Sequence, residues 1–306
     1  MLAFIAPGQG AQTPGMLSPW ITDPAAKLLL SQWSHEIDLD LVRLGTTADS
    51  DEIKDTANAQ PLIVAAGLLG ARALGSARLE IVVGHSVGEI TAAAIAGVID
   101  DVDAMKLVRA RGIEMAKAAA LKPAGMAAVL GGDREVVLRA ISDLGLVAAN
   151  DNGGGQIVAA GDLDALAKLA PEGARVRALA VAGAFHTSYM QPAVAPLQEI
   201  AAKISVHAAK CPVISNKDGA VLRDGREILD RIVAQISNPV RWDLCMTALA
   251  SHVSGAVEIP PAGTLVGLLK RAVPIIETFA LKSAEDVTLA KEFIVRHQDE
   301  QNDEDK

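Results

Sequence analysis

Short apolar runs alternate along the chain with longer segments of helical periodicity, and glycine or proline separates many of them. The runs 2–6 and 79–83 predict strands, because apolar segments of this length are typical of sheets that are buried on both faces. A predicted helix over 87–96 follows the second run, and Gly97 stands where a terminating glycine is expected. The alternation predicts an α/β fold with a mostly parallel sheet.

A segment in the middle of the chain has a different pattern. Its predicted elements are strand 126–130, helix 133–144, strands 147–150 and 156–160, helix 162–169 and strand 176–181. The order βαββαβ is that of the ferredoxin-like split βαβ motif. We therefore predict a large domain formed by residues 1–124 and 186–296, with a small ferredoxin-like domain inserted at 125–185. The polar, acidic residues 297–306 are expected to form a disordered tail.

Composition and charge narrow the class of protein. Half of the 306 residues are apolar and 21% are charged, which argues against disorder. The net charge is −9 with no basic block, so nucleic acid is not an expected partner. Polar residues interrupt the apolar stretch 79–99, so it does not predict a membrane span. Cys211 and Cys245 could form at most one disulfide and no signal peptide is evident, so a reduced, cytoplasmic setting is expected.

The clearest chemical motif is Gly84-His85-Ser86-Val87-Gly88, between a predicted strand and a predicted helix. This is the context of the G-x-S-x-G nucleophile elbow, in which a sharp turn lifts the serine to the carboxyl end of a sheet. The backbone N–H of Val87 would then face a developing oxyanion. These features favour an α/β-hydrolase-like large domain with a catalytic serine. A glycine-rich turn with an N-capping serine is the alternative.

A nucleophilic serine needs a base, and histidine is the usual one. The six histidines are His35, His85, His186, His207, His252 and His297. His186 follows a predicted strand and the turn Ala182–Phe185, a position from which it could face Ser86. A capping or packing role for His186 remains the alternative. His85 adjoins the serine and is expected to shape the pocket.

Five sequence blocks carry a resemblance to a known family. They are Pro7-Gly8-Gln9-Gly10-Ala11-Gln12, Gly84-His85-Ser86-Val87-Gly88-Glu89, Arg109-Ala110-Arg111-Gly112, Gly183-Ala184-Phe185-His186 and Asn238-Pro239-Val240-Arg241-Trp242. In this order they resemble the malonyl-CoA:acyl carrier protein transacylases of fatty acid synthesis. Acyltransferase domains of polyketide synthases share the same blocks. The resemblance extends from Met1 to about Lys282, and it implies the same inserted ferredoxin-like domain.

The resemblance implies catalytic roles at matching positions. Ser86 would be the nucleophile and His186 the general base. Gln235 would accept a hydrogen bond from the histidine, and the N–H groups of Gln9 and Val87 would form the oxyanion hole.

The resemblance also implies a set of substrate-binding residues. Arg111 would bind the malonyl carboxylate, because a guanidinium can hold a carboxylate through two hydrogen bonds. Phe185 is bulky where related acyltransferases for methylmalonyl have a small residue, so it favours unbranched malonyl. Gln60 and Asn152 match polar positions of the acyl or pantetheine channel, and His85 would border the pocket.

The implied reaction transfers malonyl from malonyl-CoA to the phosphopantetheine thiol of acyl carrier protein through a malonyl-serine. The CoA thioester would be a substrate, with no permanently bound cofactor and no metal. The carrier is typically acidic, so it would need a local basic patch on this acidic chain. Candidates for that patch are Lys117, Lys122, Arg134, Arg139, Arg175, Arg177, Lys270 and Arg271.

A different activity, a different pathway and a non-enzymatic role also fit parts of the pattern. A serine thioesterase of α/β-hydrolase type would share the elbow, but that fold orders its triad as serine, acid and then histidine. An acyltransferase that serves a polyketide pathway would share all five blocks, and so would a docking module that has lost its activity.

One departure from the family pattern lies near the C-terminus. The family often has Glu-x-Gly-Pro-Gly there, where this chain has Glu258-Ile259-Pro260-Pro261-Ala262-Gly263. Proline restricts φ to values near −65°, whereas glycine can adopt positive values. A differently shaped rim of the channel is therefore expected.

Overall fold

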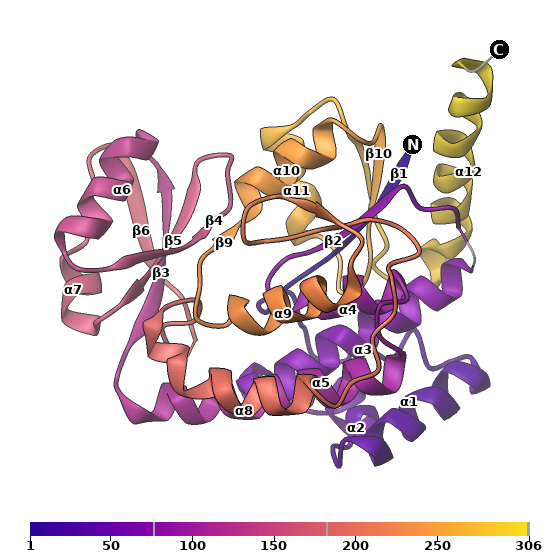
Figure 1. Ribbon diagram of the computed structural model, residues 1–306, viewed down its shortest axis with the longest axis horizontal. Coiled ribbons are helices and arrows are strands. Elements are labelled where there is room, and N and C mark those ends of the chain that lie inside the picture. Colours follow the sequence, from indigo (N-terminus) through magenta and orange to yellow (C-terminus); the bar gives the residue numbers. More distant parts are fainter. Residues whose placement is uncertain (76, 182, 305–306) are drawn as a thin grey trace.

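The computed structural model describes residues 1–75, 77–181 and 183–304, with side chains up to Gln298, and these residues form two β-sheets flanked by helices (Figure 1). Ala182, in the turn predicted before His186, and residues 305–306 of the predicted tail lie outside the described residues. Over the part of the chain that is described, no helix combines the length and apolar character needed to cross a membrane.

The larger sheet has six strands in the order β11-β10-β1-β2-β7-β8, and all neighbours are parallel except β7 and β8. The strands are β1 Leu2–Ala6, β2 Ile81–Gly84, β7 Val213–Ile214, β8 Val221–Leu222, β10 Gly255–Glu258 and β11 Glu277–Ala280. The predicted strands 2–6 and 79–83 correspond to β1 and β2. The mixed α/β class with a mostly parallel sheet is therefore confirmed.

A hydrophobic cluster covers each face of this sheet, and the side chains of β1 point alternately into one cluster and the other. Phe4 packs into the larger hydrophobic cluster, whereas Ala3 and Ile5 pack into the cluster on the opposite face. The helices that contribute to the larger cluster are α1 Pro24–Glu36, α2 Leu41–Thr46, α3 Thr56–Leu74, α4 Gly88–Ile95, α5 Asp101–Leu121, α8 Gln191–Ala201, α9 Gly225–Gln235 and α12 Val287–Glu304. Helices α10 Trp242–Ala250 and α11 Thr264–Ala272 cover the other face (Figure 1).

The smaller sheet has the order β6-β3-β5-β4-β9. Its elements are β3 Gly125–Gly131, α6 Arg134–Asp143, β4 Val147–Asp151, β5 Gln156–Gly161, α7 Leu163–Lys168, β6 Ala174–Ala178 and β9 Val240–Arg241. From β3 to β6 the order is βαββαβ with antiparallel neighbours, as the sequence predicted. This unit, here called the small subdomain, lies at one end of the molecule with α6 and α7 on its outer side (Figure 1).

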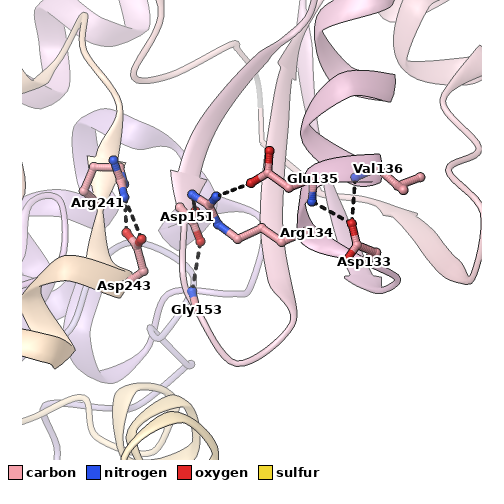
Figure 2. Close-up of polar contacts among 8 residues, drawn as sticks. All are labelled: Asp133, Arg134, Glu135, Val136, Asp151, Gly153, Arg241 and Asp243. Carbon is pink, nitrogen blue, oxygen red and sulfur yellow. Dashed lines mark hydrogen bonds and ion pairs between the residues drawn. The ribbon is translucent and has the colours of Figure 1, made fainter.

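Strand β9 joins the small subdomain to the rest of the chain. It runs parallel to β4, with Asn150 opposite Val240 and Asp151 opposite Arg241. Figure 2 shows ion pairs at this junction: Arg134 holds Asp151 at 2.7 Å, and Arg241 holds Asp243 at the same distance. Because β9 belongs to the later part of the sequence, its pairing with β4 ties the small subdomain to that part of the chain through backbone hydrogen bonds.

The C-terminal segment differs from the prediction. Residues 297–304 continue helix α12 (Val287–Glu304) where a disordered tail was expected from residue 297. The side chain of His297 is 3% exposed, with Nδ1 3.0 Å from Oγ of Ser254. Phe293 and Ile294 are also buried, so the buried face of α12 extends to His297.

Candidate active site

The serine of the predicted elbow lies in a sharp turn between β2 and α4. Ser86 has a left-handed backbone with φ 54°, which L-residues rarely adopt. Two glycines allow the turn to be this tight: a Cβ on Gly84 would lie 1.9 Å from the carbonyl carbon of Gly88, and one on Gly88 would lie 2.2 Å from the carbonyl oxygen of Ala6. The side chain of Ser86 is therefore lifted to the carboxyl end of the sheet.

His186 is in direct contact with this serine. Its Nε2 lies 2.7 Å from Oγ of Ser86, and its Nδ1 lies 2.9 Å from the backbone carbonyl oxygen of Gln235. A carbonyl oxygen can only accept, so Nδ1 carries the proton and Nε2 presents its lone pair to the hydroxyl. Burial, with a smaller contribution from the charge of Arg111, lowers the pKa of His186 to about 3. The imidazole is thus neutral near pH 7 and able to take a proton from Ser86.

The two backbone N–H groups of the predicted oxyanion hole lie at one edge of the larger sheet. Gln9 follows β1, and Val87 precedes the first residue of α4. Strands β1 and β2 are adjacent and parallel, so both residues are at the same edge of the sheet. Within the described chain neither backbone N–H has a hydrogen-bond partner, which leaves both free to donate to a bound oxygen.

Arg111 places a buried positive charge beside the serine. It lies on α5, is 1% exposed, and its Nη2 donates to Oγ of Ser86 at 3.3 Å and to Oε1 of Gln235 at 3.0 Å. Nη1 donates to Oε1 of Gln60 at 2.7 Å. Burial lowers the pKa of Arg111 to about 10, opposed by the charge of Glu89, so the guanidinium stays protonated at neutral pH. In the part of the chain described here, its buried Nε has no partner.

A cavity of about 250 Å³ brings the predicted site residues together between the two sheets. Its lining includes Gln9, Gln60, His85, Ser86, Arg111, Asn152, Phe185 and His186. Val87 and Gln235 do not line the cavity, but both are buried next to it. The predicted site residues, taken from distant parts of the sequence, are thus assembled around one space.

His85 and Asn152 form the wall of this cavity next to the small subdomain. The Nε2 atom of His85 lies 2.8 Å from Oδ1 of Asn152, whose Nδ2 donates to Oε1 of Gln156. The imidazole also packs edge-on against Trp242, with the ring centroids 5.4 Å apart. Burial lowers the pKa of His85, so its neutral form is favoured.

Gln235 contacts His186 through its backbone and Arg111 through its side chain. The acceptor for His186 is the backbone carbonyl of Gln235, which leaves the side-chain amide to bind Arg111. A hydrolase triad of the serine–histidine–acid type would instead place a carboxylate at Nδ1. The described contacts of His186 therefore differ from those expected for a serine thioesterase.

Two buried polar residues of the site were not singled out by the sequence. Asn216 follows β7, and its Oδ1 accepts from the backbone N–H of Ser86 at 2.8 Å while its Nδ2 donates to the carbonyl of Gly84 at 2.7 Å. Glu89 lies on α4 and is 3% exposed. Burial raises the pKa of Glu89 to about 8, and the N–H of Asn216 and the charge of Arg111 oppose this rise. A charged residue just after the elbow in an apolar helix was the available signal for Glu89.

The comparisons with known proteins agree with the class that this arrangement defines. A serine with an adjacent neutral imidazole can accept an acyl group and pass it on, which is the chemistry of an acyltransferase. A family model described as the acyl transferase domain matches residues 3–302. The "Malonyl CoA-acyl carrier protein transacylase" of Mycobacterium tuberculosis is 52% identical over 94% of this chain and 98% of the relative. The chain therefore belongs to the malonyl CoA-acyl carrier protein transacylase family.

More distant relatives and solved structures extend this similarity. The protein of the same name from Bacillus subtilis is 33% identical over 94% of this chain and 96% of its own length. The crystal structure of MCAT from Mycobacterium tuberculosis superposes with a TM-score of 0.91 at 51% identity, covering 95% of this chain and 99% of that one. A structure described as a type II PKS acyl-carrier protein in complex with its malonyl-transacylase gives a TM-score of 0.89 at 30% identity, covering 95% and 99% of the two chains.

Proposed function

We propose that this protein transfers the malonyl group from malonyl-CoA to the phosphopantetheine thiol of an acyl carrier protein, and so supplies extender units for fatty acid synthesis. The observation that carries the proposal is a buried guanidinium, Arg111, within 3.3 Å of a serine hydroxyl that contacts a neutral imidazole. A cation in this position favours an acyl group that ends in a carboxylate.

In the first half of the reaction, Oγ of Ser86 attacks the thioester carbonyl of malonyl-CoA while Nε2 of His186 takes the hydroxyl proton. The carbonyl oxygen becomes an oxyanion and accepts hydrogen bonds from the N–H groups of Gln9 and Val87. Collapse of this intermediate breaks the carbon–sulfur bond. The CoA thiolate leaves with the proton from His186, and malonyl remains on Ser86 as an ester.

The second half reverses these steps with a new thiol. His186 takes the proton of the phosphopantetheine thiol, and the sulfur attacks the malonyl ester. The oxyanion forms again at the same two N–H groups. The proton then passes from His186 to Oγ of Ser86, which leaves, and malonyl-carrier protein is released. Every step in this proposal uses groups of the protein and of the two substrates, and none requires a permanently bound cofactor.

Arg111 and Phe185 support selection of malonyl among acyl groups. The guanidinium faces Ser86 and offers a partner to a carboxylate at the far end of the acyl chain. Phe185 is 6% exposed, precedes the base and lines the cavity, where its ring limits the room for a branch at the second carbon. Malonyl satisfies both conditions, acetyl lacks the carboxylate and methylmalonyl adds the branch.

The carrier protein is proposed to dock on basic residues at the rim of the cavity. Among the predicted basic residues, Lys117 and Arg134 are paired with carboxylates, and Lys122 lies over the ring of Tyr189. Lys270 and Arg271 are exposed on α11, whose residues Thr264, Leu265 and Leu268 line the cavity. We assign these two to the docking surface, because an acidic partner that delivers its thiol to Ser86 must cover this rim.

One experiment compares transfer of malonyl, methylmalonyl and acetyl from CoA to a purified acyl carrier protein. Malonyl transfer is expected to be fastest, and release of free malonate is expected to be slow. Hydrolysis as fast as transfer would support a thioesterase, and absence of any acyl-enzyme would support a docking module. Arg271→Glu should raise the KM for the carrier protein, whereas Arg139→Glu, an exposed arginine on α6, is the matched control. Equal KM values for the two variants would contradict the proposed docking surface.

A further inference from the structure

Glu89 is a buried carboxyl group to which the reaction above gives no role. Oε1 accepts from the backbone N–H of Asn216 and Oε2 accepts from Nε2 of Gln235, each at 2.6 Å. Both partners are donors, which suits the ionised carboxylate, because that form only accepts hydrogen bonds whereas the protonated form has an O–H group that must donate. The backbone N–H of Asn216 is fixed by the turn after β7. A protonated or amidated side chain would therefore accept there and present a donor to Gln235.

The amide of Gln235 has a donor end and an acceptor end, and its surroundings determine which way it points. Three acceptors surround Nε2: Oε2 of Glu89 at 2.6 Å, Oδ1 of Asn216 at 3.1 Å and the carbonyl oxygen of Ser86 at 3.2 Å. The contact with Glu89 is the shortest of these and the only one with a charged acceptor. The other end, Oε1, accepts from Nη2 of Arg111.

We infer that Glu89 is a positioning residue for the acyl pocket, because it holds the amide of Gln235 with Oε1 toward Arg111 and so fixes the guanidinium beside Ser86. A reversed amide would place Nε2 against the guanidinium, donor against donor, and release Arg111 on that side. The backbone of Gln235 holds His186 independently of this orientation. Glu89 therefore acts on recognition of the carboxylate and leaves the serine–histidine pair in place. The inference rests on the proposed role of Arg111.

Charged and titratable groups from four parts of the fold act on Glu89 or respond to its charge. They are Arg111 on α5, Arg231 on α9, Asp218 in the turn between β7 and β8, and Cys245 on α10. Burial raises the pKa of Glu89 to about 8, opposed by the Asn216 N–H and the two arginines, whereas burial holds the pKa of the Cys245 thiol well above its usual value. Positioning of Arg111 should therefore improve as pH rises through the range near 8.

The test measures acyl-enzyme formation from malonyl-CoA and from acetyl-CoA and compares the two kcat/KM values as a ratio. Glu89→Gln keeps the size of the side chain but presents a donor to Gln235. At about pH 9, where the carboxyl group of Glu89 is ionised, we expect the malonyl-to-acetyl ratio to be about ten- to hundredfold lower in the variant than in the wild type, mainly through the KM for malonyl-CoA. Labelling of Ser86 by phenylmethanesulfonyl fluoride, a neutral reagent, should continue at nearly the wild-type rate. Glu199→Gln makes the same chemical change at an exposed position of α8 and should leave the ratio unchanged.

Two further measurements separate positioning from a general packing effect. Gln235→Met removes the side-chain amide at nearly constant volume. Adding Glu89→Gln to it should not lower the ratio further, because the contacts that link Glu89 through Gln235 to Arg111 are already lost. In the wild-type protein the ratio should rise between about pH 7 and about pH 9, whereas in Glu89→Gln it should stay low and flat.

Several results would overturn the inference. These are a wild-type ratio in Glu89→Gln, equal losses for both substrates, additive effects in the double variant, and the same pH profile in both proteins. Should Glu89→Gln fail to fold, Gln235→Met alone tests the link from Gln235 to Arg111, and an unchanged ratio in that variant would also reject the inference. Failure of the proposed function has a different signature, since the wild-type protein itself would then show no preference for malonyl.

Discussion

Ser86 and His186 are 100 positions apart in the sequence, yet their side chains meet at 2.7 Å and both residues have a left-handed backbone, with φ 54° and 61°. Such conformations cost about 1–3 kcal/mol each and persist only where the surrounding structure enforces them. At Ser86 the β2–α4 turn does so, and at His186 the backbone N–H donates to the carbonyl of Ile236. The two local distortions point the hydroxyl and the imidazole at one another.

Replacing the nucleophile should remove the acyl-enzyme entirely. In Ser86→Ala no oxygen remains within reach of Nε2 of His186, so incubation with malonyl-CoA should give no mass increase of the intact protein by mass spectrometry. Ser31→Ala, which changes an exposed serine on α1, is the control and should acylate like the wild-type protein. A malonyl adduct that persists in Ser86→Ala would move the nucleophile to another residue.

The low pKa of His186 predicts an unusual pH dependence. With a pKa of about 3 the imidazole is already neutral at mildly acidic pH, so kcat/KM for acylation should change little between about pH 5 and about pH 7. The unfolded chain binds this proton near the ordinary pKa of 6.5, so the free energy of unfolding should fall as pH falls from 6.5 toward 3. Urea unfolding of wild type and His186→Gln at several pH values measures this difference. A wild-type acylation rate that halves near pH 6.5 would contradict the buried, neutral base.

The main elements of the fold could be predicted because their signals are local. The apolar run of β1, the glycines around Ser86 and the βαββαβ order each lie within a short stretch of sequence. Strand β9 has only two residues, too few for a periodic pattern, so its pairing with β4 could not be predicted. The burial of His297 on α12 was not predicted either, because the acidic composition of residues 297–306 indicated disorder.

Some residues of the site were predicted and others were missed, because a local sequence pattern does not show whether a polar side chain is buried. Arg111 on a helix has the same local pattern as a solvated arginine, and only its spacing after the elbow indicated a role. Asn216 binds the backbone of the elbow, and Glu89 binds both Asn216 and Gln235. The two contacts of Glu89 join residues 127 and 146 positions apart. Sequence patterns describe neighbours along the chain, so partners at this separation become visible only in the folded structure.

Removing the buried carboxylate at the start of α11 should weaken the fold. Glu258 is fully buried and accepts from three backbone N–H groups at the start of α11, each at 2.9 Å: Gly263, Leu265 and Val266. Glu258→Gln would turn an amide donor toward these donors and lower the free energy of unfolding by about 1–3 kcal/mol. Urea unfolding measures the loss, with the exposed Glu292→Gln as control. Equal midpoints for the two variants would show that the cap contributes nothing.

Arg111 allows the proposed selectivity to be tested at the residue that carries it. Loss of one partner of a buried charge pair costs about 2–5 kcal/mol, so Arg111→Ala should lower kcat/KM for malonyl-CoA by a factor of about tens to thousands. Acetyl-CoA has no carboxylate to lose, and its transfer should change far less. Arg111→Lys keeps the charge without the planar fork, so it should fall between wild type and alanine for malonyl. Parallel kcat/KM measurements with both thioesters decide the matter, because equal losses would mean that the guanidinium supports the serine and does not bind the substrate carboxylate.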